Sequence, residues 1–135
     1  MVALDSRIQR DDAFTVAILR AGVVFGLIGI ALIHFLDVFA KLNETPYLGG
    51  LYIALMLGCV VVGERLLRRE EAALWTAAAV LAGLTLFGYV LSRSVGLPSA
   101  TADIGNWEEP LGLASLFVEG LVILLSGYAL AITER

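Results

Sequence analysis

The sequence is poor in charge and in the residues that most often carry chemistry. Asp, Glu, Lys and Arg make up only 16% of its 135 residues, against roughly 25% in a typical soluble domain. It has one histidine, His34, and one cysteine, Cys59, so no disulfide can form within the chain and dithiol redox chemistry is excluded. Basic residues form no patch and the formal net charge is −4, which argues against nucleic acid as a partner. Phosphate loops, HExxH zinc motifs and nucleophile–base sets are also missing, so we expect no independent hydrolase or transferase.

Apolar residues are abundant instead. They make up 59% of the chain, and the mean hydropathy is +0.89. A helix needs about 20 mostly apolar residues to span a bilayer, and four runs meet this length, at about 13–40, 47–67, 72–92 and 111–132, with the longest connection at 93–110. The sequence therefore predicts a single all-α membrane domain over residues 1–135, an up-down-up-down four-helix bundle.

The first apolar run, GVVFGLIGIALIHFLDVF, is too long for the core of a signal peptide and contains His34 and Asp37. We therefore expect it to be a retained helix. Arginines follow the positive-inside pattern, which predicts that both termini are cytoplasmic in a multi-pass protein of the cell membrane. The cytoplasmic side would hold Arg7, Arg10, Arg65, Arg68, Arg69 and Arg135, and the other side only Lys41 and Arg93.

Small residues recur at helical spacing and predict close helix contacts. Gly22 and Gly26 form a GxxxG pair in the first span, and Gly50, Ala54 and Gly58 form a stripe in the second. We expect the bilayer and a second copy of the chain to be partners, with a homodimer forming through one of these faces. A larger membrane complex is the alternative. Trp75 is expected at a membrane interface.

Polar residues of all four spans fall at similar depth. His34 lies six residues, about 9 Å, from the outer end of the first span, and Glu119 lies eight residues, about 12 Å, from that of the fourth. An ionisable group at this depth usually faces inward and has a partner, so His34 and Glu119 are each other's predicted partners. The predicted inward faces of the third and fourth spans are Ala78, Ala82, Thr85, Tyr89 and Ser92, and Gly112, Ser115, Glu119, Val122 and Ser126.

These residues predict a polar pocket in the outer leaflet, but they leave its chemistry open. The candidate ligand-binding residues are His34, Asp37, Tyr52, Thr85, Tyr89, Trp107 and Glu119, with Trp107 as an interface anchor or a residue of a lid. The ligand would be a small molecule or a proton, and a divalent metal would be held by His34, Asp37 and Glu119. Haem would instead take His34 as its axial ligand in a homodimer. A proton-coupled transporter that titrates Glu119 also fits this pattern, and so does an accessory subunit in which the pair only fixes packing.

Four segments of the sequence resemble small uncharacterised four-span integral membrane proteins of high-GC bacteria. They are SRSVGLPSATADIGNWEEPLG, ASLFVEG, HFLDVF and NETPYLGGLY. The resemblance covers most of the chain from the first span onward. It implies the four-span fold and a bacterial source, but it brings no activity with it.

Overall fold

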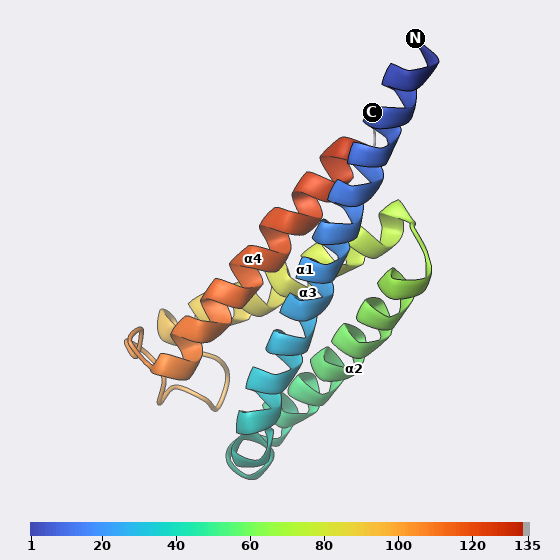
Figure 1. Ribbon diagram of the computed structural model, residues 1–135. Helices are drawn as coiled ribbons and strands as arrows, with labels where there is room; N and C mark the ends of the chain where they lie inside the picture. Colours follow the sequence, from blue (N-terminus) through green and yellow to red (C-terminus); the bar gives the residue numbers. More distant parts are fainter. Residues whose placement is uncertain (134–135) are drawn as a thin grey trace.

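The computed structural model describes residues 1–133 and consists of four helices: α1 (Val2–Glu44), α2 (Pro46–Arg68), α3 (Ala72–Arg93) and α4 (Pro110–Thr133). Successive helices run in opposite directions (Figure 1). The start of α1, the end of α4 and the 69–71 turn therefore form one end of the bundle, the termini end. Thr45 and the 94–109 loop form the other, the loop end. All four helices are long and apolar enough to cross a membrane, which confirms the predicted helical fold and indicates a multi-pass membrane protein.

The first helix is longer than the predicted span. It begins at Val2 rather than near Ala13, because residues 2–13 contain no glycine or proline to interrupt it. The polar residues at the start of α1 shorten the part of the helix that can lie in the membrane, but they do not end the helix. The helix also continues through the expected linker to Glu44, so that buried Thr45 alone joins α1 to α2. Pro46 opens α2, where its fixed φ suits the first helical turn. Arg135, one of the arginines that predict the orientation, lies outside the described residues.

The GxxxG pair of α1 packs inside the chain. A Cβ atom at Gly22 would lie 2.7 Å from Cδ1 of Leu125, and one at Gly26 would overlap Cγ2 of Val122. Both neighbours belong to α4, so these glycines bring α1 and α4 together and do not offer the dimer face expected of them. Gly58 of the second stripe contacts Leu81 of α3. The homodimer itself stays a prediction.

The predicted inward face of α4 is confirmed, since its five positions are all buried. That of α3 is confirmed in part: Ala78, Ala82 and Ser92 are buried, whereas Thr85 and Tyr89 are partly buried. Cys59 packs in the core. The expectation for Trp75 was wrong, since this side chain is only 1% exposed and belongs to the core of the bundle.

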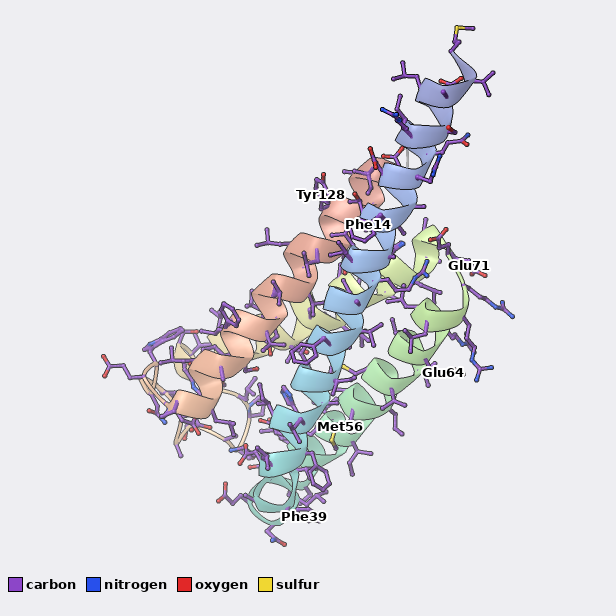
Figure 2. The ribbon with its side chains drawn as sticks, viewed as in Figure 1. Phe14, Phe39, Met56, Glu64, Glu71 and Tyr128 are labelled. Atoms are coloured by element: carbon purple, nitrogen blue, oxygen red, sulfur yellow. The ribbon has the colours of Figure 1, made fainter. Side chains whose placement is uncertain are left out.

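The outer surface of the bundle is apolar along its length and charged at its ends. Large side chains such as Phe25, Phe117 and Leu124 point outward and are more than 70% exposed. Charged groups gather at the α2–α3 turn, where Glu64 binds Arg68 at 2.8 Å (Figure 2). This arrangement fits a lipid environment around the helices.

The bundle is open at the loop end. The 69–71 turn joins α2 to α3, and the two helices are still in contact halfway along, where a Cβ at Gly58 would lie 3.2 Å from Cδ2 of Leu81. Toward the loop end the two helices separate (Figure 1). A cavity lined by residues of both helices lies there.

Candidate functional site

A cavity of about 510 Å³ occupies the loop end of the bundle and is lined by all four helices and the 94–109 loop. Its size falls within the range of roughly 300–1,000 Å³ that is usual for small-molecule sites. The apolar part of the wall is mainly leucine, and most of these side chains come from α2 and α3. They are Leu48, Leu51, Leu55, Leu81 and Leu84.

The cavity opens sideways between α2 and α3. Leu51 of α2 and Leu84 of α3 both line it, yet they are 58% and 64% exposed. The opening is therefore framed by apolar side chains on the face that meets lipid. Beside it, the hydroxyl of Tyr47 donates a hydrogen bond to the carbonyl of Pro98 at 2.5 Å and ties α2 to the loop.

The 94–109 loop forms the roof. Gly96, with φ of 84°, lets the chain turn at the end of α3 while its N–H donates to the Leu91 carbonyl at 2.8 Å. The N–H of Gly105 donates to the carbonyl of Arg93 at 2.7 Å, so the loop returns to the helix it left. Residues from both halves of the loop line the cavity, including Pro98 and Asp103.

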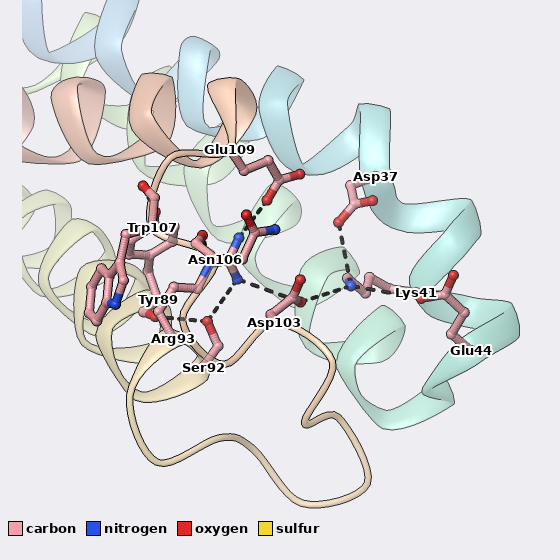
Figure 3. A network of polar contacts seen from close by, with 10 residues as sticks. All are labelled: Asp37, Lys41, Glu44, Tyr89, Ser92, Arg93, Asp103, Asn106, Trp107 and Glu109. Carbon is pink, nitrogen blue, oxygen red and sulfur yellow. Dashed lines mark hydrogen bonds and ion pairs between the residues drawn. The ribbon is translucent and has the colours of Figure 1, made fainter.

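Arg93 holds this roof in place (Figure 3). Although charged, its side chain is only 9% exposed. Its guanidinium lies 2.6 Å from the carboxylate of Glu109 and 3.5 Å from that of Asp103, and its Nε donates to the Asn106 carbonyl at 3.1 Å. It also donates to the hydroxyl of Ser92 at 2.9 Å. The buried guanidinium of Arg93 thus binds three residues in the second half of the loop.

Lys41 continues the polar network on α1. Its Nζ lies 3.5 Å from Asp103 and 3.9 Å from both Asp37 and Glu44. Asp103 is therefore shared between Lys41 and Arg93 and connects α1 to α3 through the loop (Figure 3). The carboxylate of Asp37 is drawn to this lysine, at the loop end of the cavity.

Tyr89 belongs to the cavity wall, whereas Trp107 does not. The guanidinium of Arg93 lies 4.5 Å from the ring centroid of Tyr89. The Tyr89 hydroxyl donates to the carbonyl of Trp107 at 3.2 Å, and the two ring centroids are 6.0 Å apart. Trp107 is 42% exposed and packs on the outside of the roof. It braces the loop from outside.

Glu119 marks the deep end of the cavity. It is fully buried, on the face of α4 that lines the cavity. The hydroxyl of Ser115, one helical turn earlier, donates to its Oε1. Its Oε2 finds no hydrogen-bond partner among residues 1–133.

His34 also lines the cavity, but it bonds within its own helix. Its Nδ1 lies 2.8 Å from the carbonyl of Ile30, and because a carbonyl only accepts, Nδ1 carries the proton. The ring packs edge-on against Tyr52, with centroids 4.7 Å apart. The predicted partnership is not formed as a hydrogen bond: His34 bonds to Ile30 and Glu119 to Ser115. The two residues share a cavity rather than a contact.

The predicted metal site is not assembled. Within residues 1–133 no three His, Cys, Asp or Glu side chains come together closely enough to hold a metal ion. The expected set of His34, Asp37 and Glu119 is spread along the cavity, because Asp37 is attracted to Lys41 and Glu119 is held by Ser115 on α4.

Comparison with known proteins adds no assignment. No family model, curated protein or solved structure matches this chain.

The cavity brings together six of the seven predicted ligand-binding residues: His34, Asp37, Tyr52, Thr85, Tyr89 and Glu119. The Thr85 hydroxyl donates a hydrogen bond to the carbonyl of Leu81 at 2.7 Å.

Sequence reasoning missed the roles of Ser115, Lys41 and Arg93. The sequence did contain a signal for Lys41 and Arg93. They are the only basic residues at the two connections predicted to lie outside the membrane, and acidic residues are near both in the sequence.

Proposed function

We propose that the protein binds a small lipid-soluble ligand in the loop-end cavity, and that the ligand reaches it from the bilayer through the opening between α2 and α3. The observation that carries this proposal is that opening. A cavity of about 510 Å³ walled by leucines meets the apolar surface of the bundle at Leu51 and Leu84. An apolar molecule dissolved in lipid would reach it without crossing water.

The polar groups favour binding of an amphiphile over a purely apolar molecule. Lys41 and Arg93 lie at the roof and Glu119 at the deep end, while leucines of α2 and α3 form the apolar part of the wall between them. A few placed polar groups on an apolar wall are typical of sites that orient a ligand. With both termini cytoplasmic, as the arginine distribution predicts, the cavity lies in the outer leaflet of the cell membrane.

The experiment compares two glycines of α3. Gly88 lines the cavity and Gly83 does not, and a Cβ at either position meets no described atom within 4 Å. Gly88→Phe therefore fills the cavity without a backbone clash, and Gly83→Phe is its matched control on the same helix. Binding of trifluorooctanol to the protein in lipid nanodiscs is measured by fluorine NMR.

The Gly88→Phe protein is expected to bind this probe at least about tenfold more weakly than wild type, which corresponds to about 1.4 kcal/mol. The Gly83→Phe protein is expected to bind like wild type. Equal binding by all three proteins, or none by wild type, would refute the proposal.

A further inference from the structure

We infer that the ligand carries a protonated amine, which binds to Glu119 at the deep end of the cavity while its apolar body extends toward Leu51 and Leu84. This inference rests on the proposed function and adds the chemical class of the ligand. Two independent observations support it. One is the unpartnered oxygen of Glu119, and the other is the balance of charge around the cavity.

Glu119 is fully buried, yet only one of its carboxylate oxygens has a partner among the described residues. Ser115 donates to Oε1, and Oε2 is left without a donor. Buried side-chain oxygens nearly always have a hydrogen-bond partner, and leaving one without a partner is unfavourable. Because Glu119 is one of the residues that line the deep end of the cavity, a ligand that fills this end is the group placed to supply the missing donor.

The charges that line the cavity identify the donor as a cation. Four carboxylates, from Asp37, Asp103, Glu109 and Glu119, face two cations, Lys41 and Arg93. Both cations are engaged at the roof: Arg93 binds Glu109 and Asp103, and Lys41 lies near Asp37 and Asp103. Within residues 1–133 no cation pairs with Glu119. A ligand group that both supplies the missing donor and offsets this excess of carboxylates is positively charged and able to donate hydrogen bonds.

An ammonium group meets both requirements. It carries one positive charge and N–H donors, and a charge-assisted bond to a carboxylate is among the stronger hydrogen bonds. A divalent metal fits less well, since the described residues offer no set of three suitable ligands. The leucine walls and the opening toward lipid then require an apolar body on the amine.

The test uses two probes with the same tail, trifluorooctylamine and trifluorooctanol, in lipid nanodiscs at neutral pH, where the amine is protonated. Wild type is expected to bind the amine at least about tenfold more tightly than the alcohol. Glu119→Gln removes the charge with little change in shape, and it is expected to abolish this preference while retaining binding of the alcohol. Glu108→Gln is the matched control, because Glu108 is an exposed loop carboxylate that does not line the cavity.

The outcomes separate this inference from the proposed function. Equal binding of both probes by wild type, or a preference that survives in Glu119→Gln, would refute the amine site and leave the cavity as a binding site. Failure of wild type to bind either probe would refute the proposed function. A third probe needs no variant: the trimethylated amine has the same charge but no N–H group. It is expected to bind wild type at least about tenfold more weakly than the amine, and equal binding would overturn the inference.

Discussion

Arg93 and Glu109 close the 94–109 loop at its two ends, with Nη2 of the arginine 2.6 Å from Oε2 of the glutamate. Arg93 is the last residue of α3, and Glu109 directly precedes α4. The ion pair therefore joins the two helices at the level where the loop leaves one and enters the other. The position of the roof depends on this pair.

Arg93→Ala is expected to loosen the loop. It removes two ion pairs, a hydrogen bond to the Asn106 carbonyl and the contact with the Tyr89 ring. Because the side chain is buried but its carboxylate partners are partly exposed, we expect a loss of about 1–3 kcal/mol in unfolding free energy. Amides of residues 97–107 should exchange faster with deuterium. The exposed Arg69→Ala is the control and should change neither quantity measurably. Unchanged exchange in Arg93→Ala would show that the roof is held by other contacts.

Gly26→Ala is expected to push α1 away from α4. The added methyl group would overlap Val122, and overpacking of this kind typically costs about 1–3 kcal/mol. Gly127→Ala on α4 is the control, because a Cβ there meets no described atom within 4 Å. It should be neutral or stabilising by about 0.5–1 kcal/mol. Thermal unfolding in detergent measures both. Val122→Ala should partly restore the stability of the Gly26→Ala protein, and the prediction fails if Gly26→Ala is as stable as its control.

Much of the fold and part of the site could be predicted from the sequence. Helical spacing alone identified the buried faces of α3 and α4, because small and polar residues recur there every three to four positions. Counting residues from the span ends located His34 and Glu119 at the depth where both line the cavity. Periodicity and depth are local properties, and the sequence contains them directly.

The rest depended on tertiary contacts. Depth gives the height of a residue in the bundle but not its direction around the helix axis, so His34 and Glu119 share a cavity without bonding to each other. A GxxxG pair looks the same whether its partner helix is in the same chain or another, and Gly22 and Gly26 contact α4. The partners of Arg93 come from a loop whose path has no periodic signal.

Labelling of introduced cysteines is expected to confirm that both termini are cytoplasmic. The prediction rests on the arginines near the termini end and the scarcity of cations at the loop end. In a Cys59→Ala background, Asn43→Cys and Ala102→Cys should react with an impermeant maleimide added outside intact cells. Ser6→Cys and Arg69→Cys should react only after the membrane is opened. Labelling of Arg69→Cys from outside would reverse the topology and move the cavity to the inner leaflet.

Two double-mutant cycles should distinguish a bonded pair from a shared cavity. Ser115 donates to Glu119, so Ser115→Ala leaves a buried carboxylate without its donor and should cost about 1–3 kcal/mol. In a Glu119→Leu background the same change should cost almost nothing, which gives a coupling energy of about 1 kcal/mol or more. His34 bonds to Ile30 instead, so His34→Leu and Glu119→Leu should add within about 0.5 kcal/mol. The free energy of unfolding in detergent measures both cycles. A coupling between His34 and Glu119 as large as that between Ser115 and Glu119 would mean that the histidine and the glutamate interact directly, and not merely through the cavity that they share.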